Sequence, residues 1–194
     1  MRREKRKYEL KKRAQEMAET HRRITEAAIE LHGTVGPART TMSAVAKRAG
    51  VERRTLYRHF PTEAELFEAC SSHYFAAHPL PDLSAWSGDL EGALAELYAY
   101  YERTAPMFAN ALRDAELVDF ARDAMAPLHT YLDDTATVLA EGRDGPLVKP
   151  AVRHAIAFST WQSLSANGLD RTTAARLMTA LVDHVTSPAP SASS

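Results

Sequence analysis

The stretch RTTMSAVAKRAGVERRTLYRHF, residues 39–60, contains two short helical patterns separated by one glycine. Thr41 is suited to N-cap the first pattern, whose valine and alanines point to one side. Gly50 then breaks that helix. In the second pattern Leu56 and Phe60 lie four residues apart and therefore share a face. We expect two short helices joined by a tight turn.

A third helical pattern precedes these two. Ile24, Ala27, Ala28 and Leu31 follow the i, i+3, i+4, i+7 spacing of one helix face. The glycines and the proline of GTVGP, residues 33–37, end this helix. Three short helices with a glycine turn before the third describe a helix-turn-helix module.

The outer face of the third helix is strongly cationic. Arg54 and Arg58 extend from it four residues apart, beside Arg53 and Tyr57. A DNA major groove admits one α-helix, arginine binds guanine O6 and N7 through two hydrogen bonds, and hydroxyl and imidazole groups bind phosphates. Residues 49–60 are therefore a candidate recognition helix.

Charge is divided unevenly along the chain. The formal charge of the whole chain is −1, yet residues 1–60 sum to +9 and residues 61–194 to −10. A phosphate-carrying partner explains segregation of this size better than a solvated basic face does. We expect that partner to be double-stranded DNA.

The first thirteen residues, MRREKRKYELKKR, carry eight Lys or Arg. They predict a basic arm over residues 1–17 that can continue into the first helix. Such a block is also typical of a disordered, solubilising tail. Arms that enter the minor groove give the DNA-binding interpretation a physical precedent. The sequence leaves both interpretations open.

From about His21 to Phe75 the chain resembles the TetR (tetracycline-repressor-like) transcriptional regulators. The fragments ITEAAIEL, TTMSAVAKRAGV, TLYRHF and EAELFEA occur in the order and spacing of that family's DNA-binding domain. The resemblance implies that threonines, Tyr57 and His59 bind phosphate and that residues around Arg53 and Arg54 face the bases. The predicted DNA-binding residues are Arg39, Thr41, Ser43, Lys47, Arg53, Arg54, Thr55, Tyr57, Arg58 and His59.

Three positions depart from the family pattern. The family usually has serine and glycine where this chain has Glu52 and Arg54, and a lysine where it has Glu63. Glu52 should cap the third helix less well than serine, and it brings negative charge toward DNA. Arg54 offsets that charge if it reaches a base, and the basic arm can replace the phosphate contact of the missing lysine.

The rest of the chain predicts a larger helical domain. Proline and glycine separate helical patterns at 63–77, 88–104, 106–114, 117–141, 150–167 and 170–186. With 45% apolar residues, the chain is long enough to bury a substantial core. We predict an all-α protein with an arm at 1–17, a helix-turn-helix domain at 18–78, an effector-binding and dimerisation domain at 79–186 and a disordered tail at 187–194.

Aromatic residues of this larger domain are candidates to line a small-molecule pocket, which the family encloses here. A stripe of aromatics at helical spacing is more often plain core, so both interpretations stand. Leu94, Leu97, Tyr98 and Tyr101 share one helix face, and Phe158 is among the residues expected to converge on it. The predicted ligand-binding residues are Tyr98, Tyr101, Phe108, Phe120, His129, Trp161 and Gln162.

The last two helical patterns carry apolar stripes that can pair with their copies across a twofold axis. Burial within one subunit is the alternative, and the resemblance favours a homodimer through the last two helices. The stripes are Val152, Ala155, Ile156 and Ser159 in the first helix, and Ala174, Leu177, Met178, Leu181 and Val185 in the second.

Catalytic and metal-binding patterns are missing from the sequence. It has no GxSxG, Walker A or GxGxxG motif, and its eight histidines lack metal-ligand spacing. We therefore expect no enzyme activity, no metal and no cofactor. The lone Cys70 is expected in the core. No apolar run is long enough to cross a membrane or to form a secretory signal, which predicts a cytoplasmic protein.

Two functions fit these features. The first is a regulator that leaves a palindromic operator when a small molecule of unknown identity binds the larger domain. The second is a constitutive or architectural DNA-binding protein whose helical body only dimerises. They differ in whether that body takes up a ligand.

Overall fold

The computed structural model describes residues 2–82, 86 and 88–186, and within this part the chain is helical with no strand. The predicted all-α class is confirmed. The chain divides into two compact units. Unit 1 comprises Met1–Pro79 and Ala109–Ala124, and unit 2 comprises Leu80–Phe108 and Met125–Ser194. The tail predicted at 187–194 lies outside the described residues.

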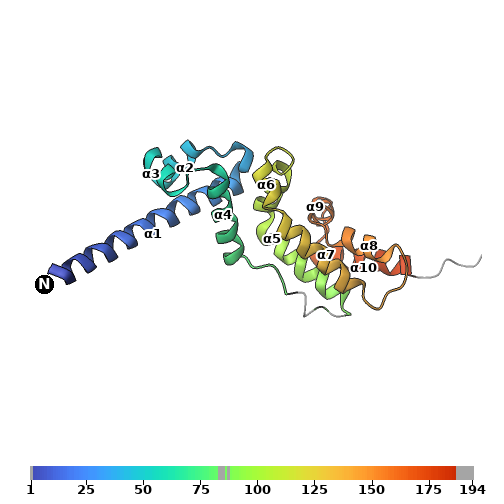
Figure 1. Ribbon diagram of the computed structural model, residues 1–194. Coiled ribbons are helices and arrows are strands. Elements are labelled where there is room, and N and C mark those ends of the chain that lie inside the picture. The colour runs from blue at the N-terminus through green and yellow to red at the C-terminus, as the bar shows by residue number, and fades with distance from the viewer. Residues whose placement is uncertain (1, 83–85, 87, 187–194) are drawn as a thin grey trace, which may run out of the picture. The chain divides into compact units, whose positions relative to one another are not determined.

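Unit 1 begins with the three helices expected from the sequence (Figure 1). The hydroxyl oxygens of Thr41 and Thr62 accept hydrogen bonds from the backbone N–H groups of Ala44 (3.2 Å) and Glu65 (3.1 Å), so each threonine N-caps the helix that follows. The elements of unit 1 are α1 (Arg2–Thr34), η1 (Pro37–Arg39), α2 (Met42–Ala49), α3 (Arg53–His59), α4 (Glu63–Ala77) and α6 (Asp119–Asp123), with the last turns of α5 (Leu90–Asp114).

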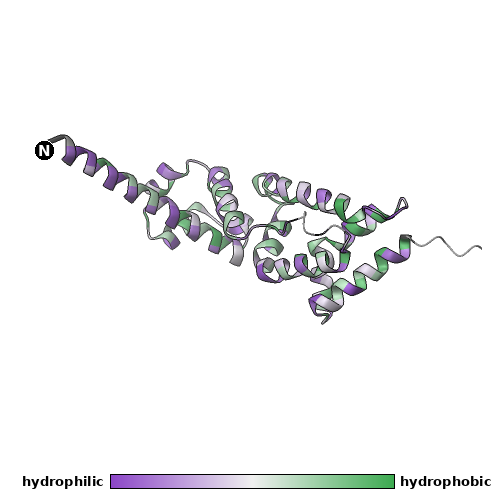
Figure 2. Cartoon of the chain, turned by 90° about the horizontal axis from the view of Figure 1, so that it is seen from below, coloured by the Kyte–Doolittle hydropathy of each residue, from purple (hydrophilic) through white to green (hydrophobic). Residues whose placement is uncertain are grey.

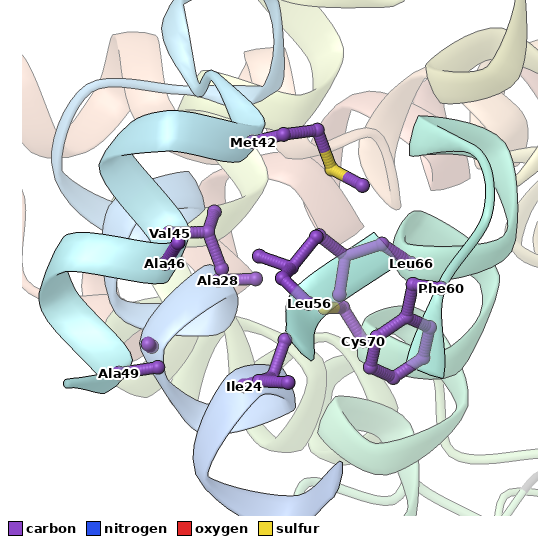
Figure 3. Packing of buried hydrophobic residues seen from close by; sticks show 11 residues of the cluster. Ile24, Ala28, Met42, Val45, Ala46, Ala49, Leu56, Phe60, Leu66 and Cys70 are labelled. Atoms are coloured by element: carbon purple, nitrogen blue, oxygen red, sulfur yellow. The ribbon is translucent and has the colours of Figure 1, made fainter. Parts of the chain in front are cut away.

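The apolar faces of α1 to α4 meet in one buried cluster (Figure 3). Leu56 of α3 is fully buried there with Ile24 of α1 and Val45 of α2. Cys70 of α4 lies in the same cluster, as expected, and burial raises the pKa of its thiol to about 12. The complete cluster is Ile24, Ala27, Ala28, Met42, Val45, Ala46, Ala49, Leu56, Phe60, Leu66 and Cys70.

Among the described residues of unit 2, the longer part of α5 packs with four further helices. α8 contacts α7 and α10, and α10 also contacts α9. In the described part of the chain no helix has the length and apolar character needed to cross a membrane. Besides α5, the helices of unit 2 are α7 (Ala126–Ala140), α8 (Val148–Ala155), α9 (Phe158–Ala166) and α10 (Arg171–Thr186).

Three predicted helix boundaries in this region are wrong. The helices expected at 88–104 and 106–114 form a single helix, α5, with Pro106 inside it. Its apolar face stays in phase across the proline, with Tyr101 buried before it and Phe108 after it, and this burial offsets the lost hydrogen bond. The helix expected at 117–141 is two helices, α6 and α7, and the one expected at 150–167 is interrupted between α8 and α9.

Side-chain hydroxyls stabilise the break between α8 and α9. The backbone carbonyls of Ala155 and Ile156 accept hydrogen bonds from the hydroxyls of Tyr98 and Tyr101, both at 2.7 Å. The Thr160 hydroxyl donates to the His154 carbonyl at 2.7 Å. These carbonyls are buried or half-buried at the end of a helix, where an unpaired acceptor would be costly. The two tyrosines of α5 therefore allow the chain to turn between α8 and α9.

The end of α5 holds the end of α1 inside unit 1. The Asn110 side-chain amide donates to the carbonyls of His32 (3.0 Å) and Gly33 (2.9 Å), and a carboxylate oxygen of Asp114 accepts from the Ala38 N–H at 2.9 Å. The His32 ring is buried against Phe67, with ring centroids 5.0 Å apart. Burial lowers the pKa of His32 to about 4, and the negative charge of Asp114 only partly opposes this shift.

We predict that His32 makes stability depend on pH. Above pH 6.5 both the folded and the unfolded chain hold a neutral imidazole. Between pH 6.5 and about 4 only the unfolded chain binds the proton, so the free energy of unfolding falls with pH, by up to about 3 kcal/mol from this residue. The free energy of unfolding, measured with denaturant across this pH range, should depend less steeply on pH for His32→Gln than for the unchanged protein. The exposed His129→Gln is the matched control, and equal slopes for both variants would contradict the assignment.

Candidate nucleic-acid interface

Helix α3 separates its apolar and cationic residues on two faces. Leu56 points into the cluster of unit 1, and the following Phe60 is also buried. Arg54, Tyr57 and Arg53 are exposed on the outside. The Arg53 guanidinium lies 5.8 Å from the centroid of the Tyr57 ring, within cation–π range, which restricts both side chains before any partner binds. The outer face is therefore a preorganised cationic surface.

The turn between α2 and α3 depends on Gly50 and Arg23. Gly50 has φ 65°, a left-handed conformation that side chains disfavour, and a Cβ there would meet only the Arg23 guanidinium at 3.5 Å. The Arg23 guanidinium donates to the carbonyls of Ala49 (2.5 Å) and Gly50 (3.1 Å). Arg23 thereby fixes the C-terminal end of α2 to α1, a role that the sequence pattern did not indicate.

The candidate phosphate-binding residues lie where helices begin and end. Thr41 is exposed at the start of α2, and its hydroxyl hydrogen remains available for donation while its oxygen caps the helix. Thr55 and His59 on α3 are half-buried. Burial first, and then the nearby Arg58 and His21, lower the pKa of His59. A neutral imidazole still carries one N–H that can bind a phosphate oxygen.

Acidic residues modify this surface in three places. Glu52 occupies the N-cap position of α3 without a capping hydrogen bond from its side chain. Arg48 of α2 forms an ion pair with Glu30 of α1, with 2.8 Å between Nε and Oε2. Glu63 is exposed in the first turn of α4. The structure places all ten predicted DNA-binding residues on η1, at the start of α2, on α2 or on α3, and none of them is buried.

The predicted ligand-binding residues do not all come together. Four of the seven, Tyr98, Tyr101, Phe108 and Trp161, are buried in unit 2. The Tyr101 ring lies 5.8 Å from Phe108 and 5.9 Å from Trp161 between ring centroids, and Phe158 packs among them. We call Tyr98, Tyr101, Phe108, Phe158 and Trp161 the aromatic cluster.

The other three predicted residues are not among these buried aromatic residues of unit 2. Phe120 belongs to unit 1, where its ring centroid lies 5.1 Å from that of Phe67. His129 on α7 and Gln162 on α9 are exposed. Helical spacing indicates which residues share a face, but it does not show which face packs inward when a helix such as 117–141 is divided.

An open hollow of about 240 Å³ lies elsewhere in unit 2. Residues of α8, α9 and α10 line this hollow, and its polar lining comes from serine, threonine and histidine side chains. The lining residues are His154, Ser159, Thr160, Ser163, Leu164 and Met178. Within the described residues, no group of three or more His, Cys, Asp or Glu is arranged to hold a metal ion.

The apolar stripes predicted for dimerisation are divided between core and surface. Val152, Ala155 and Ile156 are fully buried within the chain, which corrects their expected place at an interface. On α10, Leu177 and Leu181 are 41% and 52% exposed, whereas Ala174 and Met178 are buried. The two exposed leucines of α10, which lie four positions apart, therefore remain available to a second copy.

A three-helix head whose third helix presents arginines and a tyrosine above a closed core is a helix-turn-helix DNA-binding domain. Residues 24–70 match the model of the bacterial regulatory proteins of the tetR family. Over 78 residues, 38% of the chain, it is 36% identical to the HTH-type transcriptional regulator SrpR of Pseudomonas putida. The match spans about a third of that relative's length, 36%. Over residues 24–70 the chain is therefore similar to the DNA-binding domain of tetR-family regulators.

Two solved structures share the helical fold. A putative fatty acid metabolism regulator of Clostridium perfringens has a TM-score of 0.62 at 16% identity, over 86% of this chain and 100% of that chain. The multidrug binding protein EbrR, complexed with malachite green, has a TM-score of 0.56 at 18% identity, over 87% of this chain and 98% of that chain. At these identities the likeness concerns the fold.

We predict that Arg54 and Tyr57 contribute to DNA binding in different ways. Arg54→Ala should relax base preference and cost roughly 1–3 kcal/mol at one position of each half-site. Tyr57→Phe removes a hydroxyl that suits a phosphate, so it should weaken all sequences alike. Binding of both variants to cognate and scrambled duplexes measures the difference. Lys149→Ala, which removes an exposed charge from α8 in unit 2, is the control for charge alone. An equal loss on both duplexes for Arg54→Ala would rule out base reading.

Proposed function

We propose that the protein is a dimeric transcriptional repressor that binds a palindromic operator and is released from it by a small molecule. The observation that carries this proposal is the exposed cationic face of α3 above the closed core that α1 to α4 form. A rigid core lets the short helix enter a major groove without losing its shape.

In this proposal the residues of unit 1 divide into base-reading and positioning groups. Arg53 and Arg54 lie at the start of α3, which is the end that contacts base edges in helix-turn-helix complexes. Thr41, Tyr57 and His59 bind phosphates and set the register of α3. The Glu52 side chain makes no capping hydrogen bond and brings negative charge to the start of α3. The Arg54 guanidinium offsets that charge, which supports a role for Arg54 in contacting a base.

A second copy of the chain is the proposed partner of α10. Leu177 and Leu181 lie one helical turn apart and are exposed apolar residues. Large exposed leucines on one helix face favour association, and a twofold axis makes the same patch serve both copies. Two recognition helices related by that axis require an inverted repeat in the DNA.

The aromatic cluster is the proposed site of the effector. An aromatic ligand that enters it has to displace packed rings or the hydroxyls of Tyr98 and Tyr101, which hold the break between α8 and α9. α5 carries both tyrosines and, at its other end, Asn110 and Asp114, which hold the end of α1 and the loop after it. A shift of α5 therefore couples ligand binding to the DNA-binding unit. EbrR, which has the same fold, binds malachite green.

The closed packing of the aromatic cluster favours a second candidate function, a constitutive or architectural DNA-binding protein. In that case unit 2 provides only the dimer contact. A titration of the DNA complex with malachite green, followed by tryptophan fluorescence and by DNA retention, distinguishes the two candidates. Saturable quenching together with DNA release supports the ligand-responsive repressor.

We predict that Leu177→Glu combined with Leu181→Glu produces a monomer, because charged side chains would oppose each other across the axis. Losing the link between two half-site contacts should lower affinity for an inverted repeat by at least about 100-fold. Sedimentation and DNA binding measure both effects. Leu147→Glu, at another exposed leucine of unit 2, is the matched control. A double variant that remains dimeric would exclude α10 as the interface.

A further inference from the structure

The basic N-terminal segment is a helical extension of α1. α1 runs from Arg2 to Thr34, 33 residues, and its first residue in the core of unit 1 is Ile24. The described side chains from Arg6 to Glu19 are all exposed, and this part of α1 projects past the helices packed on it (Figure 1). It is largely hydrophilic (Figure 2). We call residues 2–20 the arm helix.

The arm helix has one sector that contains cations and no acid. At about 100° per residue, a third of the circumference holds Arg6, Lys7, Leu10, Arg13, Ala14 and Met17, on the same side as Ile24. The remaining two thirds holds all four described acids of this segment, which are Glu4, Glu9, Glu16 and Glu19.

The cationic sector lies on the side of α1 that carries the recognition helix. His21 falls in the same sector, and its ring centroid lies 4.5 Å from that of Phe60 and 6.2 Å from that of His59. These two residues form the C-terminal end of α3. The sector therefore starts beside a candidate phosphate-binding residue and continues away from it along the arm helix.

The cations of this sector are free to bind a partner. In the described part of the chain, Arg6, Lys7 and Arg13 form no ion pair, whereas Lys12 on another side pairs with Glu16 at 3.8 Å. The 15 residue-to-residue steps from Arg6 to His21 span about 22 Å, or about six base pairs of duplex. The sector therefore reaches well beyond the recognition helix.

A second arm helix is a poor occupant for this surface. Arg6, Leu10, Arg13 and Met17 follow the three- and four-residue spacing of a coiled-coil seam, but such pairing would bury two guanidinium groups without a carboxylate. A polyanion satisfies the same groups directly. Because the sector adjoins α3, the fitting polyanion is the DNA that α3 binds.

We propose that the arm helix is a second DNA-binding surface, which holds the phosphate backbone of the duplex flanking each half-site through Arg6, Lys7 and Arg13. This inference rests on the proposed DNA binding by α3. The arm helix contributes affinity and salt dependence, because phosphate contacts carry no base information. It also supplies contacts that Glu63 cannot make at the start of α4.

The test compares two charge-matched double variants of the full chain. Arg6→Gln with Arg13→Gln removes two charges from the cationic sector, and Lys11→Gln with Lys12→Gln removes two from outside it. On a duplex with ten-base-pair flanks, the first variant should flatten the slope of log affinity against log salt by about 1.8. When the salt concentration rises from 50 to 200 mM, the fold-loss of affinity should be roughly ten times smaller for the first variant than for the unchanged protein. The second variant should keep the original slope.

Two further readouts separate the possible results. On a duplex without flanks the slopes of all three proteins should agree, and preference for cognate over scrambled DNA should survive in each. Circular dichroism checks that the arm helix remains helical. Equal slopes for both variants on the flanked duplex would overturn the inference while leaving DNA binding by α3 intact. Failure of the unchanged protein to prefer any DNA would overturn the proposed function itself.

Discussion

Burial of Leu56 is the interaction on which the DNA-binding surface depends. α3 has only seven residues, and a helix of that length is not stable alone in water. Leu56 fixes it against Ile24 and Val45, while Arg23 and Gly50 set the direction in which it leaves α2. The outer residues of α3 then need no further contacts within the chain, so they can remain exposed and charged.

A similar division of roles appears in α5. Its tyrosines stabilise the interrupted segment between α8 and α9, and its last turns hold the end of α1 and the following loop. The same helix thus satisfies buried acceptors in unit 2 and backbone groups in unit 1. A movement of α5 along its axis would disturb hydrogen bonds in both units, and the proposed release by a ligand depends on such a movement.

Periodicity predicted the three-helix head because its helices are short, capped and separated by glycine. Thr41, Gly50 and Leu56 carry signals that act over a few residues. The interruption at Ile156 has no such signal, because it depends on hydroxyls of Tyr98 and Tyr101 that come from more than fifty residues away. For the same reason the sequence did not indicate Arg23, or that Phe120 packs in unit 1 while His129 and Gln162 face outward.

In the proposed complex two copies of α3 read one symmetrical DNA site. Selection of bound duplexes from a random pool by the full-length protein is the decisive measurement. We expect enrichment of an inverted repeat whose half-site centres lie about 10 base pairs, or a multiple of this, apart. A pool that stays unselected, or one that converges on a single unrepeated site, would contradict the account.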